Sequence, residues 1–405
     1  MMPQDVSIKE FNYSLPQERI AQFPLAERDQ SKLLIYRKGS IFGSVFSSLP
    51  QQLTENDLLI FNQTRVVNAR LFFFTESGAR IEIFCLSPAN SSDVASELQK
   101  HDKAEWTCLV GNARKWKEGA VLTIKSGTSG NIVEARLAGR EEDAFKVVFS
   151  WNDSEMSFGE ILEEAGTLPI PPYLNRNPEE DDELRYQTIY AEADGSVAAP
   201  TAGLHFTPGI FSELKSKEIA VGFLTLHVGA GTFKPVKAET MASHTMHREE
   251  VSVSLKLIEQ LADASGNIVA VGTTSLRTLE SLYWTGLRLE ENPEAPLEIN
   301  VGQWEPYSHN SSLPSVSHVM NALALKLKNK GLSELRGHTR LLILPGYTFR
   351  MTDVLITNFH QPESTLLLLV SAFVGDDWRR IYDYALKNDF RFLSFGDSSI
   401  LFRNK

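Results

Sequence analysis

The stretch VAAPTAGLHFTPGIFSELKSKEIAVGFLTLHVGAGTFKPV at residues 197–236 places two glycine-bearing loops around one helix and one strand. Residues 198–203 are small enough for their backbone N–H groups to approach a ligand, and Pro208 suits the first turn of a helix over residues 209–217. Residues 221–228 are largely apolar, as in a strand covered on both faces, and a second glycine loop follows them. Because ligands of open α/β sheets bind beyond such strand ends, the two loops predict one pocket.

A third loop belongs to the same prediction. It follows an expected strand at residues 268–272 and starts an expected helix at residue 273, where free N–H groups favour polar or anionic ligand groups. Tight turns and ordinary helix capping would explain these patterns without a ligand. The candidate wall residues are Pro200, Thr201, Gly203, Gly229, Gly231, Thr232, Gly272, Thr273 and Thr274.

Length and composition indicate a globular protein of two domains. A chain of 405 residues exceeds the size at which one hydrophobic core keeps growing, and 42% hydrophobic with 22% charged residues is ordinary for folded proteins. The first ten residues contain no apolar signal region, and the apolar runs are too short to span a bilayer. We expect a cytoplasmic protein without membrane contact, and we take a monomer as the default.

The pattern of residues 69–152 differs from that of the flanking chain. Six short β-prone runs alternate there with turn signals such as Glu76-Ser77-Gly78, at roughly even spacing and without helices. This pattern predicts a small β-barrel or sandwich. The flanking residues 1–68 and 153–405 alternate buried strands with helices, which is typical of an α/β domain. Buried strands are expected there at residues 32–36, 57–61, 340–344, 353–357 and 392–395, and apolar residues at helical spacing predict a helix at residues 316–327. The acidic run at residues 178–183 is most simply a solvated loop.

Two sets of residues bear on metal sites. Cys85 and Cys108 stand alone without a CxxC pair, which argues against a disulfide framework, an iron–sulfur cluster or a zinc–thiolate site. The pattern His244-x-x-His247-x-Glu249 matches no complete zinc signature. We therefore expect no metal.

Charge alone disfavours a nucleic-acid partner, because 40 Lys and Arg face 51 Asp and Glu, a net charge of −11. A local basic face can still contact phosphates. Arg114-Lys115-Trp116-Lys117 places three cations and an aromatic ring in one expected hairpin loop, and arginines such as Arg65 and Arg70 suit bidentate phosphate contacts. Solvated turns and surface salt bridges are the alternatives. The RNA-binding candidates are Arg65, Arg70, Arg114, Lys115 and Lys117.

Several long motifs together resemble one protein family. VAAPTAGLHF, TLHVGAGTFKPV, HTMHREE, VAVGTTSLRTLES, TNFHQPESTLLLLVSAF and FLSFGDSSILF are similar to the S-adenosylmethionine:tRNA ribosyltransferase-isomerases, as are RIAQFPLAERDQSKLL, LLIFNQTRVVNARLF and LPIPPYLNR with RYQTIYA upstream. The resemblance covers nearly the whole chain. It implies an α/β main domain, discontinuous in sequence, with an inserted small all-β barrel domain at residues 69–152.

The resemblance also implies a reaction. The ribosyl moiety of S-adenosylmethionine would be transferred and isomerised onto aminomethyl-deazaguanine at the wobble position of a tRNA anticodon, giving epoxyqueuosine-tRNA, adenine and methionine. S-adenosylmethionine would be a co-substrate, and no further cofactor would be needed. Proton transfer near neutral pH suits histidine and carboxylate side chains. The candidate catalytic residues are His205, His227, His247, Glu249, His360 and Glu363.

One segment, at about residues 283–340, departs from the family by its length, so we interpret it as an insertion. It keeps open the alternative of a non-catalytic RNA-binding relative with the same fold. A nucleotide-dependent oxidoreductase is disfavoured, because no GxGxxG follows an early strand with an acidic residue at the expected distance.

Overall fold

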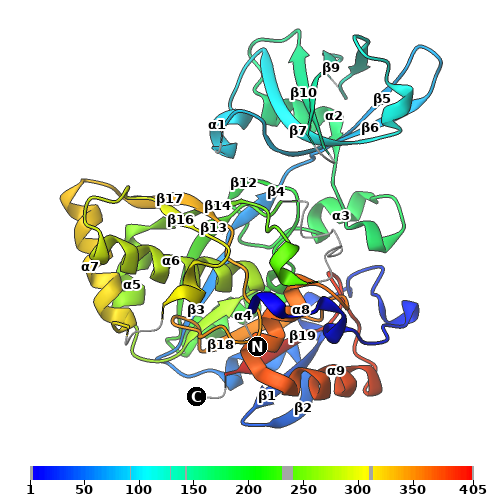
Figure 1. The fold of residues 1–405 in the computed structure, drawn as a ribbon. Coiled ribbons are helices and arrows are strands. Elements are labelled where there is room, and N and C mark those ends of the chain that lie inside the picture. Colours follow the sequence, from blue (N-terminus) through cyan, green and yellow to red (C-terminus); the bar gives the residue numbers. More distant parts are fainter. Residues whose placement is uncertain are drawn as a thin grey trace.

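The computed structural model describes residues 3–91, 93–127, 129–141, 144–229, 240–309 and 313–403. The chain forms two bodies, a β-barrel and a larger α/β body below it (Figure 1). The barrel strands come from the middle of the sequence, whereas the large sheet takes strands from both sides of them. The predicted fold class, a discontinuous α/β domain with an inserted barrel, is therefore confirmed.

The main body is built on a ten-stranded sheet of order β16-β17-β14-β13-β3-β15-β18-β19-β1-β2. Its centre, β13-β3-β15-β18, is parallel. Antiparallel pairings flank this centre, at β13–β14 and at β18–β19. The strands are β1 (Lys32–Arg37), β2 (Ser40–Val45), β3 (Leu58–Asn62), β13 (Ala220–Leu226), β14 (Glu249–Ser254), β15 (Ile268–Val271), β16 (Ile299–Val301), β17 (Glu334–Thr339), β18 (Val354–Asn358) and β19 (Ser398–Phe402).

Both faces of the central strands are buried, which explains their unbroken apolar runs. In β3, Leu58 and Ile60 pack into one core while Leu59 and Phe61 pack into another. Successive side chains of a strand point to opposite faces, so a strand covered on both sides must be apolar throughout.

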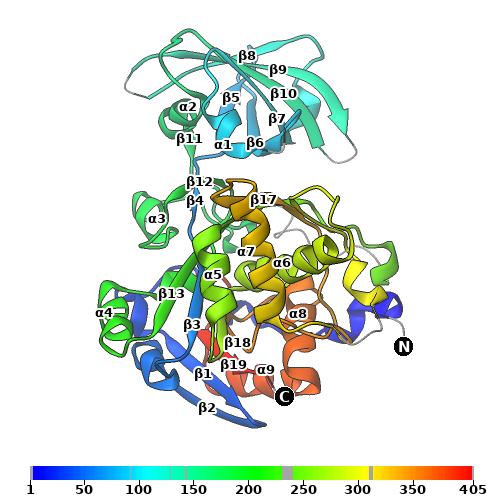
Figure 2. The same ribbon diagram turned by 90° about the vertical axis from the view of Figure 1, so that its left-hand side faces the viewer.

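Helices cover the two faces unequally (Figure 2). Residues of α5 to α9 fill the larger core, and residues of α4 fill the other. The helices are α1 (Val94–Leu98), α2 (Phe158–Ala165), α3 (Glu180–Arg185), α4 (Pro208–Ser216), α5 (Leu255–Asp263), α6 (Thr273–Glu291), α7 (Val316–Asn329), α8 (Thr365–Val374) and α9 (Trp378–Lys387).

The barrel closes because β5 pairs with β8 as well as with β6, in the order β5-β6-β7-β10-β9-β8. Its interior holds large side chains such as Phe73, Trp106 and Phe149. All six strands were predicted from the sequence. They are β5 (Arg70–Phe74), β6 (Arg80–Pro88), β7 (Lys103–Gly111), β8 (Val121–Lys125), β9 (Ile132–Glu141) and β10 (Ala144–Trp151).

The barrel body continues past the domain boundary expected near residue 152. Phe158, Ile161 and Leu162 of α2 pack into the barrel core, and β11 (Gly166–Thr167) pairs with β5. A two-stranded parallel sheet of β4 (Thr64–Val66) and β12 (Ala193–Ser196) lies between the two bodies (Figure 1).

Three local predictions from the sequence are wrong. The acidic run at residues 178–183 was expected to be a loop, but most of it lies in α3, where buried Asp182 accepts the Glu179 N–H and pairs with Arg176. A strand was expected at residues 340–344, but these residues are in no strand, and β17 (Glu334–Thr339) ends just before them. The last strand was expected at residues 392–395 and is instead β19. In the last two cases buried apolar residues pack in the core without pairing in the sheet, so burial alone misled the prediction.

Candidate functional site

A cavity lies where four separate segments of the main body meet. It encloses about 770 Å³ of empty space, part of it open to solvent. None of its described lining residues is Lys, Arg, Asp or Glu. The lining comprises Tyr173, Tyr186, residues 198–202, Val228, residues 272–274, residues 357–361, Ser364, Leu366, Leu393 and Ser394.

Backbone hydrogen bonds hold the first two segments side by side. The Val197 N–H donates to the Val228 carbonyl (3.1 Å), and the Val228 N–H donates to Ser196 Oγ (3.0 Å). The loop after β12 and the loop after β13 therefore form one continuous wall. Gly203 shapes this wall from behind, because a Cβ at this position would lie 1.9 Å from the Tyr190 hydroxyl.

The third segment is the start of α6. Gly272 has φ of +92°, which favours glycine, and its N–H donates to the Ile356 carbonyl (2.8 Å). This bond fixes the turn between β15 and α6 against β18. Thr273 and Thr274, the first two residues of the helix, line the cavity.

The fourth segment follows β18 and carries His360. Its Nε2 lies 2.9 Å from Thr357 Oγ1, its N–H donates to the Tyr382 hydroxyl (3.1 Å), and its carbonyl accepts a hydrogen bond from Tyr13. Burial lowers the pKa of His360 to about 4, so the imidazole is neutral at pH 7. A neutral imidazole fixed in this way can accept or pass a proton.

Two tyrosines and an asparagine form the remaining wall. The Tyr173 hydroxyl shares a hydrogen bond with Ser394 Oγ, and burial raises the pKa of Tyr173 to about 12. The Tyr186 hydroxyl is buried and makes no hydrogen bond of normal geometry to a described residue, although the Ala199 backbone and the Ser394 hydroxyl are polar neighbours of it. Asn358 donates its amide to the Leu393 carbonyl (3.0 Å), which fixes the side-chain orientation.

Comparisons with known proteins agree with the motifs that form this wall. A family model described as queuosine biosynthesis protein matches residues 8–401. The chain belongs to this family. Proteins named S-adenosylmethionine:tRNA ribosyltransferase-isomerase are 35% identical over 403 residues in Azoarcus sp. (strain BH72) and 36% identical over 400 residues in Citrifermentans bemidjiense. These alignments cover 98% of both chains in the first case, and 97% of this chain and 99% of the relative in the second.

A solved structure of S-adenosylmethionine tRNA ribosyltransferase from Thermotoga maritima is 27% identical, with a TM-score of 0.46, and covers 97% of this chain and 99% of that one. The alignments with the two relatives leave little of either chain unmatched. They therefore give no sign that residues 283–340 are an insertion relative to these proteins. In the structure these residues supply α7, β16 and β17 to the main body.

The predicted pocket residues of this family member fall into three groups. Pro200, Thr201, Gly272, Thr273, Thr274 and His360 line the cavity together. Gly203 supports the wall, and Gly229 follows the lining residue Val228, with open space where a Cβ would be. Gly231 and Thr232 lie outside the described residues.

His205 lies outside the cavity lining. It is buried, its Nδ1 lies 2.8 Å from Ser31 Oγ, and it borders a separate small hollow beside Arg28 and Arg391. Burial lowers the pKa of His205 to about 4. The structure therefore gives His205 a place in the packing between β1 and the 3₁₀ helix Thr201–His205.

His227 faces a different space, the cleft between the barrel and the main body. Its Nδ1 lies 3.0 Å from Thr64 Oγ1, and burial lowers its pKa to about 4. The cleft encloses about 1890 Å³ of empty space, including open solvent. Its charged or titratable lining residues are Arg65, Asp93, His101, Glu160, Glu163, Glu183, Asp194, His227, Glu250, Glu334 and Arg336.

The other three catalytic candidates do not line the cavity. His247 is exposed. Glu249 is buried on β14 and pairs with Arg277 Nη1 at 2.5 Å. Glu363 has φ of +54° and donates its N–H to the Phe11 carbonyl, next to the residue that caps α8. Among the described residues, no group of three His, Cys, Asp or Glu side chains could hold a metal ion.

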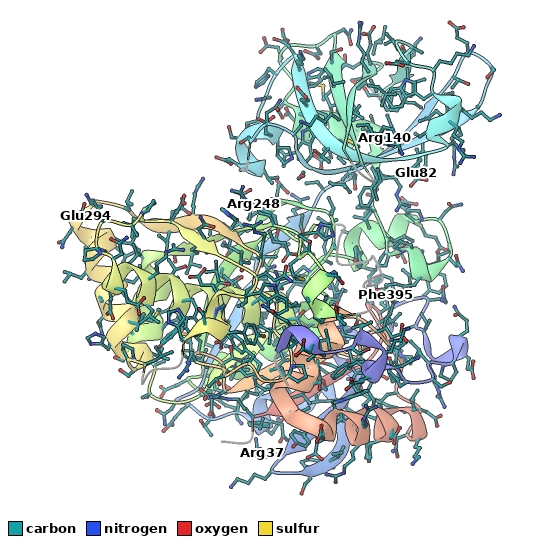
Figure 3. All side chains as sticks on the ribbon, viewed as in Figure 1. Arg37, Glu82, Arg140, Arg248, Glu294 and Phe395 are labelled. Carbon is teal, nitrogen blue, oxygen red and sulfur yellow. The ribbon has the colours of Figure 1, made fainter. Side chains whose placement is uncertain are left out.

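The RNA-binding candidates are dispersed. Arg65 lies in the cleft, 3.8 Å from Asp194. Arg70 pairs at 3.2 Å with Glu82, which lies on the part of the barrel nearest α3 (Figure 3).

The basic loop at residues 114–117 connects β7 to β8 and borders neither the cavity nor the cleft. Its Trp116 is buried in the barrel and donates to the Ala120 carbonyl, so the aromatic ring serves the barrel core.

Sequence reasoning did not single out Tyr173, Tyr186, Thr357, Asn358 or Ser394. All five lie inside the motifs LPIPPYLNR, RYQTIYA, TNFHQPESTLLLLVSAF and FLSFGDSSILF, so the motifs were noticed but their hydroxyl and amide groups were not. No helix in the described part of the chain is long and apolar enough to cross a membrane.

Proposed function

We propose that this chain is an S-adenosylmethionine-dependent tRNA ribosyltransferase-isomerase. It transfers and isomerises the ribosyl moiety of S-adenosylmethionine onto aminomethyl-deazaguanine at the tRNA wobble position. The products are epoxyqueuosine-tRNA, adenine and methionine. The observation that carries the proposal is the convergence of residues 198–202, 228, 272–274 and 357–361 on one cavity, because each segment lies in a motif shared with the family.

S-adenosylmethionine occupies this cavity as a co-substrate, and the reaction needs no further cofactor. A base must take the acidic proton from the carbon beside the sulfonium, and departing adenine must receive a hydrogen bond or a proton. Water must be kept from the reactive intermediate. The cavity supplies hydroxyl groups, backbone N–H groups and one neutral imidazole in an otherwise uncharged lining.

His360 is the described residue best placed to move a proton. It lines the cavity, Thr357 Oγ1 holds its Nε2, and its low pKa keeps the ring unprotonated at pH 7, as a base requires. Glu249 is less suited, because Arg277 already pairs with its carboxylate. His205 lies behind the wall and His227 faces the cleft, so neither side chain lines the cavity.

Adenine release tests the proposal. Purified protein is mixed with S-adenosylmethionine and tRNA that carries aminomethyl-deazaguanine, and adenine is followed by chromatography. We expect adenine only with this tRNA, and we use the same tRNA with unmodified guanine as the matched control. Equal release with both tRNAs, or methyl transfer to the RNA, would contradict the proposal. RNA binding without adenine release would favour the non-catalytic relative.

A further inference from the structure

The N-terminus of α6 opens into the cavity without a cap. Its N-cap residue is Gly272, which has no side chain to accept a hydrogen bond from the first turn. The first N–H bonded back to the cap is that of Leu276, which donates to the Gly272 carbonyl. In the described part of the chain, the N–H groups of Thr273 and Thr274 have no acceptor, although Thr273 is buried.

Five other helices have the side-chain cap that α6 lacks. A serine or threonine side chain caps the first turn of α2, α4, α5, α7 and α8. At α6 the N-cap must be glycine, because φ is +92°. An uncapped N-terminus of a long helix carries roughly half a positive charge and several free donors, and so favours an anion.

Tyr186 is an independent sign of a ligand in the same cavity. Its residue exposure is 0%, it lines the cavity, and its hydroxyl makes no hydrogen bond of normal geometry to a described residue, although the Ala199 backbone and the Ser394 hydroxyl are polar neighbours of it. It packs with Ala199, Leu204 and Phe395, whereas Gly272 lies against Ala202. Buried hydroxyls normally have partners, so a bound ligand is the natural acceptor or donor here.

The α6 N-terminus and the Tyr186 hydroxyl suit different chemical groups of a ligand. No Lys or Arg lines the described cavity, so the α6 N-terminus is its site for negative charge. A tyrosine hydroxyl suits an uncharged hydrogen-bonding group. S-adenosylmethionine carries one carboxylate at its amino-acid end and an uncharged purine at the other.

We propose that the α6 N-terminus at Gly272–Thr274 binds the carboxylate of S-adenosylmethionine, and that the Tyr186 hydroxyl bonds to its adenosine end. This orientation rests on the proposed function, because that function supplies the ligand. It places the amino-acid part against β15 and α6, and the adenosine part against Tyr186 and Ala199. His360 lines the same cavity, within which the sulfonium and ribose must then lie.

Removing one backbone donor tests the carboxylate site. Thr273 is the first helical residue, where proline is well tolerated, and the preceding ψ of 153° at Gly272 suits a following proline. Thr273→Pro therefore removes the N–H and keeps the helix, while Thr273→Ala keeps the N–H and removes only the hydroxyl. Calorimetric titration uses S-adenosylmethionine and its decarboxylated analogue, which retains the sulfonium and the amine.

We expect the wild type to bind S-adenosylmethionine at least about tenfold more tightly than the decarboxylated analogue, as for a charge-assisted hydrogen bond. Thr273→Pro should remove most of this preference, because it weakens the binding of S-adenosylmethionine and not that of the analogue. Thr273→Ala should keep the preference. Equal wild-type affinities for the two ligands would overturn the carboxylate site. So would a Thr273→Pro variant that loses affinity for both ligands equally while its thermal unfolding curve is unchanged.

Tyr186→Phe tests the other end. It should weaken S-adenosylmethionine, the decarboxylated analogue and 5′-methylthioadenosine by a similar factor, about three- to tenfold for one hydrogen bond. Unchanged affinity for methylthioadenosine would overturn this assignment. If the wild type releases adenine but binds S-adenosylmethionine and the decarboxylated analogue equally well, the orientation is wrong and the proposed function is unaffected. A wild type that does not bind S-adenosylmethionine would overturn both.

Discussion

The cavity and the cleft differ in what builds them and in what they present to a ligand. Backbone hydrogen bonds within one body hold the cavity, and its described lining has no formally charged side chain. The cleft lies between two bodies, and seven carboxylates but only two arginines line its described part. RNA phosphates would be repelled by such a surface. The cavity therefore suits an enclosed small molecule, while the RNA backbone must find its cations elsewhere.

The two spaces also differ in how they respond to conditions. The Val94 N–H of the barrel donates to Glu250 Oε2 of the main body (3.0 Å), and Arg336 lies 3.8 Å from Asp93 across the same junction. Burial raises the pKa of Glu250. The cleft therefore depends on charges that salt and acid can weaken, whereas the cavity wall depends on backbone bonds that they affect little.

Placing a leucine in the cavity and, separately, in the cleft should distinguish the two regions most clearly. Ala198 lines the cavity and is buried, while Ala193 lines the cleft and is partly exposed. We expect Ala198→Leu to lower the affinity for S-adenosylmethionine at least about 100-fold, because three added carbons occupy ligand space. Ala193→Leu should keep it within about threefold. Calorimetric titration of folded variants gives both values, and the reverse order would place the ligand in the cleft.

The histidines of the two spaces should differ in turnover. His360→Asn should lower kcat by about 100-fold, the effect of losing a proton-transfer group, and leave the affinity for S-adenosylmethionine nearly unchanged. His227→Asn should leave kcat and the affinity for S-adenosylmethionine within about threefold of the wild type, because His227 faces the cleft and not the cavity. Single-turnover rates and titrations separate these effects. An unchanged kcat in His360→Asn would return that residue to a packing role.

Buried neutral histidines also make stability depend on pH. His205 has its pKa lowered from 6.5 to about 4, so between these values only the unfolded chain binds the proton. Stability therefore falls as pH drops from 6.5 towards 4, by up to about 1.4 kcal/mol per pH unit for one histidine. His205→Asn should make this loss less steep in urea unfolding, and His318→Asn, at an exposed position, should not. An identical slope in wild type and His205→Asn would contradict the expectation.

The smallest effect is expected at the basic loop of the barrel. Reversing the charges of Arg114, Lys115 and Lys117 should weaken tRNA binding several-fold and flatten its salt dependence, because phosphate contacts release counterions. Affinity for S-adenosylmethionine should not change. Reversing three exposed lysines of the main body, Lys215, Lys256 and Lys330, is the control for total charge, because it changes the net charge by the same amount. If both sets of variants keep the wild-type salt slope, the loop is ordinary surface.

Local patterns were sufficient for most of the fold. All six barrel strands, the central strands β3, β13, β15 and β18, and helices α4 and α7 follow from apolar periodicity and turn residues. The prediction failed where an apolar run is buried without pairing in the sheet, as at residues 341–344. It also failed at α3, because the helix is stabilised by the pairing of Asp182 with Arg176, six residues earlier, and not by an apolar stripe.

The family, the fold class and most of the segments that form the cavity can be read from the sequence, because small residues, glycines and motif wording are local properties. Which histidine faces which space follows from the folded arrangement. His205, His227 and His360 look alike in sequence, yet one packs behind a wall, one faces the cleft and one lines the cavity. The direction of a side chain depends on strand register and on contacts far apart in the chain, such as Thr64 with His227 and Ser31 with His205, and these form only when the sheet is assembled.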